Sequence, residues 1–132
     1  MSTLKIGIAS FEQYKNRTMS IARGEFKPAA DDPKVWFTSV ESFAKVLSDR
    51  NRELLSVIAA THPASMNELA KKTGRALSNL SRTLKTMERY GLVHFEKGAG
   101  RQLAPRVTYT DIVLAMPLSG RSGSMEHALG PA

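Results

Sequence analysis

The chain has 132 residues, of which 42% are hydrophobic, so it can form one ordinary domain with a real core. It contains no cysteine, which excludes disulfides, zinc fingers and thiol-based redox sensing. No run approaches the roughly 20 apolar residues of a membrane-spanning helix, and the N-terminus has no secretory pattern, so we expect a cytoplasmic protein that does not enter a membrane.

Positive charge is unevenly distributed along the chain. Lys and Arg number 19 against 12 Asp and Glu, a net charge of +7. Residues 61–106 hold nine basic and three acidic side chains, a net of +6, whereas residues 1–60 have a net of +2. Clustered positive charge of this kind is typical of a surface that binds a polyanion. The alternative is that it only makes the surface soluble.

The first 33 residues predict a strand, a helix and a loop. Apolar residues alternate between Leu4 and Ile8, which is a strand pattern. Ser10 is a candidate cap for a helix over residues 11–22, where apolar side chains recur at helical spacing. The acidic pair Asp31-Asp32 lies in the loop that follows, and we expect it to be solvated.

A second strand and two helices are predicted before residue 65. Lys34–Thr38 is rich in β-branched and aromatic residues, and we expect its Trp36 and Phe37 to pack in the core or in a dimer contact. Ser39 is a candidate cap for the first helix and Asp49 for the second.

The next segment predicts two helices joined by a tight turn. Ser65 opens the first helix with Glu68 three residues on, the spacing of a capping box. Gly74 can supply the positive φ that ends it. Residues 76–90 form the second helix, whose inward face we expect to carry Leu77, Leu80, Leu84 and Met87. A helix, a glycine turn and a helix in this order indicate a helix-turn-helix.

A β-hairpin is predicted after Gly91. Leu92–Glu96 is the first strand, residues 97–101 are the tip, and Arg106–Thr110 is the returning strand. Residues 111–116 continue as an apolar strand.

The predicted fold class is therefore α+β, a winged helix-turn-helix with a helical core and a two-stranded wing. We expect it to occupy residues 34–118. A strand-helix extension over residues 1–33 precedes it and is a candidate dimer contact, and a flexible tail over residues 119–132 follows it.

A recognition helix enters the major groove and presents its N-terminal residues to base edges. Ser78, Asn79 and Arg82 are the best-placed base readers, since Asn can pair with adenine and Arg with guanine. The further candidates for contacts with bases or phosphates are Ser81 and Lys85 on this helix, Lys71, Lys72 and Arg75 near the turn, and Lys97 and Arg101 on the wing. The alternative for each is an ordinary solvated side chain.

Parts of the chain resemble known regulators. The segments that resemble winged helix-turn-helix transcriptional regulators of the MarR and ArsR type are Asn67–Ala70, Leu80–Leu84 and Met87–Val93. The Phe-x-Ser-x-Glu element at residues 37–41 is similar to one in a family of small predicted prokaryotic transcriptional regulators with a strand-helix-strand leader. Arg75 and Arg82 also fit that family. The resemblance implies DNA-binding transcriptional regulation, with a toxin–antitoxin pair as one setting, and no catalytic activity.

Three hypotheses follow. The first is a sequence-specific repressor that binds double-stranded DNA as a homodimer. The second is an antitoxin that masks a toxin protein and regulates its own operon, and the third is an RNA-binding winged helix. We expect neither an enzyme nor a cofactor, because no nucleophile–base pair or carboxylate pair stands out. His62, His94 and His127 lack the spacing of metal ligands.

Overall fold

Five helices and two small β-sheets make up the described part of the protein. The computed structural model describes residues 2–116 and 118. They separate into two compact units. The hairpin unit contains Ser2 and Ala44–Thr110, and the parallel-sheet unit contains Thr3–Phe43 and the segment that begins at Asp111. The class is α+β, as predicted, and along the sequence the hairpin unit is an insertion within the parallel-sheet unit.

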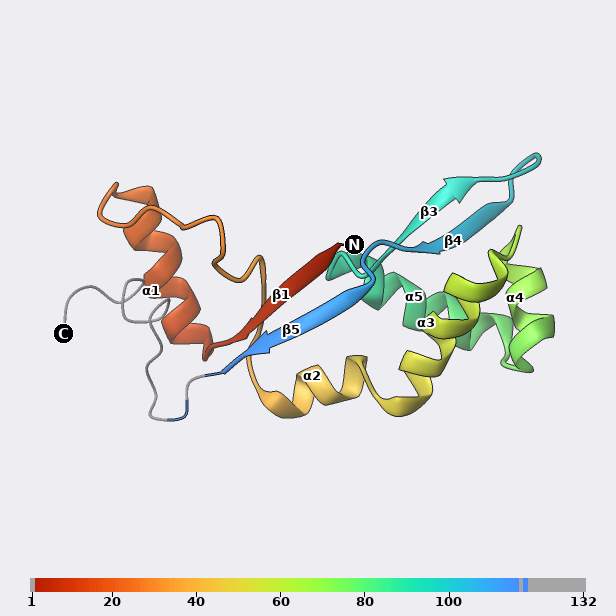
Figure 1. Ribbon diagram of the computed structural model, residues 1–132, viewed down its shortest axis with the longest axis horizontal. Coiled ribbons are helices and arrows are strands. Elements are labelled where there is room, and N and C mark those ends of the chain that lie inside the picture. The colour runs from red at the N-terminus through yellow and green to blue at the C-terminus, as the bar shows by residue number, and fades with distance from the viewer. Residues whose placement is uncertain (1, 117, 119–132) are drawn as a thin grey trace. The chain divides into compact units, whose positions relative to one another are not determined.

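The parallel-sheet unit is built around three strands in the order β2-β1-β5. They are β1 (Thr3–Ile8), β2 (Val35–Phe37) and β5 (Asp111–Ala115). The central strand β1 runs parallel to both neighbours, and Figure 1 shows it beside β5. Parallel neighbours need a crossover connection, which helix α1 (Phe11–Ala22) supplies between β1 and β2.

The two aromatic residues of β2, Trp36 and Phe37, are closely packed. Gly7 lies opposite Trp36 in the ladder, and a Cβ atom on Gly7 would come within 2.5 Å of the Trp36 ring. Only a residue without a side chain therefore lets the indole lie over β1. Phe37 is buried and meets Phe43 edge to face at a centroid distance of 5.5 Å. The expected core packing of Phe37 is thus confirmed.

Helix α1 begins as predicted, since the Ser10 hydroxyl accepts a hydrogen bond from the Gln13 N–H. Its buried residue, however, is Arg17, while Phe11 is 72% exposed. The Arg17 guanidinium lies 3.6 Å from the Asp32 carboxylate and 5.1 Å from the centre of the Trp36 ring. The prediction that Asp32 is solvated is wrong, because a buried guanidinium needs a counter-charge.

Two helices lead into the hairpin unit. Helix α2 (Val40–Val46) is capped by Ser39, as predicted, whose hydroxyl accepts from the Ser42 N–H at 3.1 Å. Helix α3 (Asp49–Thr61) is capped by Ser48 rather than by Asp49. Ser48 has the extended backbone of a cap residue, and its hydroxyl accepts from a helix N–H, so Asp49 becomes the first helical residue.

The hairpin unit continues with α4 (Met66–Thr73), α5 (Leu77–Arg89), β3 (Val93–Lys97) and β4 (Leu103–Val107). Helices α3 and α4 contact β4, and α5 contacts α4 and β3 (Figure 1). The buried apolar side chains that join these elements include Leu54, Ile58, Leu69, Leu80, Leu84, Met87, Leu92, Val93 and Ala104.

The hairpin register differs from the prediction. Strand β4 begins at Leu103, opposite Lys97, and not at Arg106. The tip spans residues 98–102 and is closed by a hydrogen bond from the Gly98 N–H to the Gln102 carbonyl. Turn geometry sets hairpin register, and alternation of apolar residues alone does not fix it.

The last strand also differs from the prediction. Residues Asp111–Ala115 do not extend the hairpin but pair with β1 over five positions, from Thr3 to Gly7. The predicted boundaries at residues 33 and 118 therefore do not coincide with those of the two units. The predicted tail, residues 119–132, lies outside the described residues.

Candidate nucleic-acid interface

Helix α5 separates apolar from polar side chains cleanly. Leu80, Leu84 and Met87 have no exposed surface, which follows from their spacing of four and three residues along the helix. Leu77 belongs to the same stripe but is 45% exposed, so its predicted inward packing is wrong. Burial needs a neighbouring element opposite the residue as well as the right angular position, and among the described residues nothing covers Leu77 fully.

The opposite face of α5 is polar and basic. Ser78, Asn79, Arg82 and Lys85 are exposed, and Ser81 is half-buried. The first acidic residue of the helix is Glu88, in its last turn. The part of α5 nearest its N-terminus therefore presents hydroxyl, amide and cationic groups without a competing carboxylate of its own.

Helix α4 and its turn set the direction in which α5 starts. The Ser65 hydroxyl accepts from the Glu68 N–H at 3.1 Å, and the Glu68 carboxylate accepts from the Ala64 N–H. This is a variant of the predicted capping box, in which the carboxylate reaches one residue further back. Gly74 ends the helix with φ of +72°, as predicted. Lys71 and Lys72 are exposed in the last turn, where the helix dipole favours cations.

Arg75 and Asn79, two predicted contact residues, are bound to each other. The Arg75 Nε and Nη2 donate to the Asn79 Oδ1 at 3.0 and 2.8 Å, and Nη2 also donates to the Asn51 Oδ1 at 3.4 Å. Burial, together with the nearby charge of Arg50, lowers the pKa of Arg75. Asn79 needs the same oxygen to pair with adenine, so that contact requires Arg75 to release it.

The hairpin exposes its two predicted basic residues. Lys97 ends β3 and Arg101 lies in the tip. Gly98 approaches the segment between α3 and α4 so closely that a Cβ atom there would lie 3.0 Å from the Ala64 carbonyl oxygen. The base of the tip is thus held against the α3–α4 connection.

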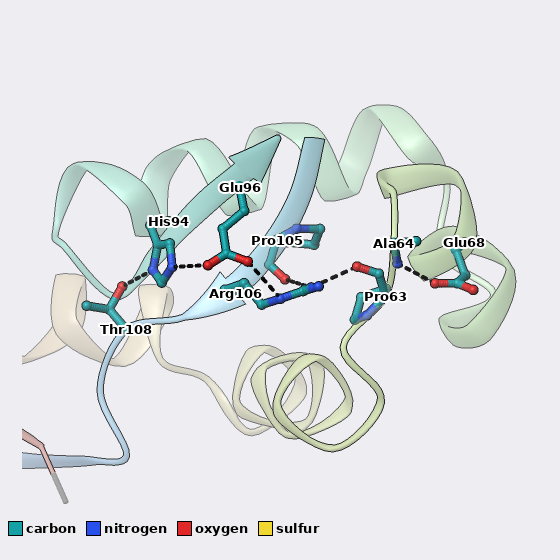
Figure 2. A network of polar contacts seen from close by, with 8 residues as sticks. All are labelled: Pro63, Ala64, Glu68, His94, Glu96, Pro105, Arg106 and Thr108. Carbon is teal, nitrogen blue, oxygen red and sulfur yellow. Dashed lines mark hydrogen bonds and ion pairs between the residues drawn. The ribbon is translucent and has the colours of Figure 1, made fainter. Parts of the chain in front are cut away.

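A network around Arg106 fixes the hairpin to the helices (Figure 2). The Arg106 Nη1 donates to the Pro63 carbonyl at 2.8 Å, and its Nε lies 3.4 Å from the Glu96 carboxylate. The other Glu96 carboxylate oxygen lies 3.5 Å from the His94 Nε2. The His94 Nδ1 lies 3.0 Å from the Thr108 hydroxyl. Sequence reasoning missed this role, because a basic residue in a strand carries no signal for a contact 43 residues away.

Neither a metal site nor a membrane segment is found among residues 2–116 and 118. No group of three His, Asp or Glu side chains there could hold a metal ion, and His127 lies outside this part of the chain. No helix in it is both long and apolar enough to cross a membrane.

Three helices followed by an antiparallel hairpin, α3 to β4, thus define an α+β unit with a polar, basic helix face. The chain belongs to the family described as HVO_A0114, whose model matches residues 46–114. The match runs from the end of α2 through the hairpin and into β5. No curated protein and no solved structure matches the chain.

Proposed function

We propose that the protein is a sequence-specific DNA-binding transcriptional regulator, a repressor, whose hairpin unit is a winged helix-turn-helix. In this proposal α4 and α5 are the helix-turn-helix, α5 is the major-groove recognition helix, and the β3–β4 hairpin is the wing. The protein would act in the cytoplasm as a homodimer on a two-fold operator.

The observation that carries the proposal is the polar face of α5. Leu80, Leu84 and Met87 are buried, which leaves Ser78, Asn79, Arg82 and Lys85 available to a groove. An α-helix fits the width of the major groove, and its side chains then meet base edges. Arg82 is the best candidate for reading guanine.

Phosphate contacts are assigned to the cations around α5. Lys71 and Lys72 at the end of α4, and Lys97 and Arg101 on the hairpin, are exposed and can neutralise phosphates on either side of a groove. Such contacts position the protein without reading sequence, so their loss should weaken binding equally for all duplexes.

The test is selection of bound sequences from a random duplex pool, followed by binding measurements on the selected sequence. Arg82→Ala should weaken specific binding by about 5- to 150-fold, the equivalent of about 1–3 kcal/mol for one bidentate base contact. Arg23→Ala removes one exposed positive charge from the parallel-sheet unit and is the matched control. Equal affinities for the parent and for Arg82→Ala would contradict the proposal, as would stronger binding of structured RNA than of duplex DNA.

A second function, an antitoxin that binds a toxin protein, is favoured by one specific observation. Helix α1 exposes Phe11 by 72%, Tyr14 by 43% and Met19 by 40%. Adjoining exposed apolar side chains are typical of a protein contact, and Phe11 and Tyr14 lie three residues apart on one face of α1. Co-expression with the neighbouring gene product tests this, since Phe11→Ser should abolish co-purification while duplex binding remains.

A further inference from the structure

A cavity of about 300 Å³ lies between α3 and the end of α4, within the hairpin unit. Its charged lining consists of Arg50, Lys72 and Arg75 against a single carboxylate, Glu53. Leu54 and Val57 supply the apolar part of the lining. Three cations and one anion give this concave surface a formal charge of +2, which favours an anionic occupant.

The guanidinium of Arg75 lines this cavity and forms no ion pair within the described residues, 2–116 and 118. Its hydrogen-bond acceptors are the neutral amide oxygens of Asn79 and Asn51. Its Nη1 is buried and donates to no acceptor among the described residues. Burial and the charge of Arg50 both lower the pKa of Arg75, which means that the protonated form is disfavoured there.

Arg50 also forms no ion pair within residues 2–116 and 118. Arg52, two residues further along α3, does contact the Asp49 carboxylate. An anion placed between Arg50 and Arg75 would offset their mutual repulsion. Among residues 2–116 and 118, no carboxylate forms an ion pair with either guanidinium.

We propose that this cavity binds one phosphate-type oxyanion through Arg50, Lys72 and Arg75. Guanidinium groups bind tetrahedral oxyanions through forked hydrogen bonds, and a lysine adds a point charge. The oxyanion can come from the DNA backbone, in which case the inference rests on the proposed function, or from a small phosphate-bearing molecule. The chemistry of recognition is the same.

Occupancy of the cavity has a consequence for α5. Two N–H groups of Arg75 donate hydrogen bonds to the Asn79 side-chain oxygen. An oxyanion competes for these donors, so its binding releases the Asn79 amide for a base edge. Phosphate capture by Arg75 and base reading by Asn79 are thereby coupled.

The first arm of the test uses inorganic phosphate and the full chain with ¹⁵N-labelled arginine. Phosphate, at constant ionic strength set with chloride, should shift the Arg75 Nε–Hε resonance saturably. Arg50→Gln should weaken this binding about tenfold, the typical effect of losing a charge-assisted hydrogen bond. Arg52→Gln removes the same charge from the same helix outside the cavity and should leave phosphate binding unchanged. Glu53→Gln removes the one carboxylate of the lining and should strengthen phosphate binding.

The second arm measures binding of a short random-sequence duplex against salt concentration. If the oxyanion comes from the DNA backbone, Arg50→Gln reduces the salt slope by about one and Arg52→Gln does not. If only the phosphate response depends on Arg50, the occupant is a small molecule. If Arg50→Gln changes neither response more than Arg52→Gln does, the proposal is overturned. Failure of every duplex to bind would instead overturn the proposed function, while the phosphate arm still decides the cavity.

Discussion

Two leucines of α5 provide a direct test of how this helix is oriented. Leu84 has no exposed surface, whereas Leu77, seven residues earlier on the same stripe, is 45% exposed. Leu84→Ala removes fully buried carbon and leaves a cavity, so the free energy of unfolding should fall by about 3–4 kcal/mol. Leu77→Ala should lower it by about 1 kcal/mol, because half of its surface is already in water.

Urea unfolding followed by far-UV circular dichroism is the appropriate assay. The single tryptophan, Trp36, lies in β2 of the parallel-sheet unit, so its fluorescence does not report on α5. With an m-value of about 1–2 kcal/mol/M, the two midpoints should differ by roughly 1–3 M. A loss of only about 1 kcal/mol for both substitutions would mean that Leu84 is not buried and that α5 turns another face to the core, because residues seven apart share one face of a helix. The polar face assigned to DNA would then be wrong as well.

Three further substitutions test other parts of the structure. Arg106→Gln should lower the free energy of unfolding by about 2 kcal/mol in the same assay, because the Pro63 carbonyl loses its donor. Gly74→Ala should lower the free energy of unfolding by about 1 kcal/mol in the same assay. The cause is backbone strain at φ of +72° and not a clash, because a Cβ atom built there meets nothing within 4 Å. Gly7→Ala should displace Trp36, shift its fluorescence emission to the red and destabilise the parallel-sheet unit by about 1–3 kcal/mol.

Each of these has an outcome that contradicts it. Arg101→Gln removes the same charge from the exposed hairpin tip, and a loss equal to that of Arg106→Gln would show that the network in Figure 2 adds nothing. A Gly74→Ala protein as stable as the parent would contradict the left-handed turn. An unchanged emission maximum in Gly7→Ala would contradict the packing of the indole over β1.

Local signals predicted most of the helices. Serine caps were predicted correctly at Ser10, Ser39 and Ser65, because a hydroxyl followed by a helix-forming run is a short-range pattern. The exception is Asp49, where Ser48 immediately before it is an equally good cap and the sequence alone offered no means of choosing. The glycine turn at Gly74 followed from the same local reasoning.

The sequence predicted the residues of the candidate interface better than the contacts that these residues make. Eight of the ten predicted contact residues are exposed, and Arg75 and Ser81 are half-buried. The cavity lined by Arg50, Lys72 and Arg75 was not predicted. Arg50 lies 25 residues before Arg75, and only the packing of α3 against α4 brings them together.

Strand pairing was the least predictable feature. Residues 111–115 have an apolar strand pattern that suits either the hairpin or β1, and the pairing with β1 joins segments more than 100 residues apart. The burial of Arg17 beside Asp32 is a similar case, since a charged residue on a helix predicts exposure until a counter-charge is brought to it.

The amino-acid sequence by itself determined where most of the helices begin, which face of α5 is apolar and where positive charge gathers. These properties depend on caps, periodicity and composition, which act over a few residues. Only the tertiary structure decided that β5 completes a parallel sheet with β1, that Arg106 holds the hairpin at Pro63, and that Arg75 binds Asn79. Such contacts depend on which distant segments meet, and the chain selects among them by total burial and hydrogen bonding rather than by any local pattern.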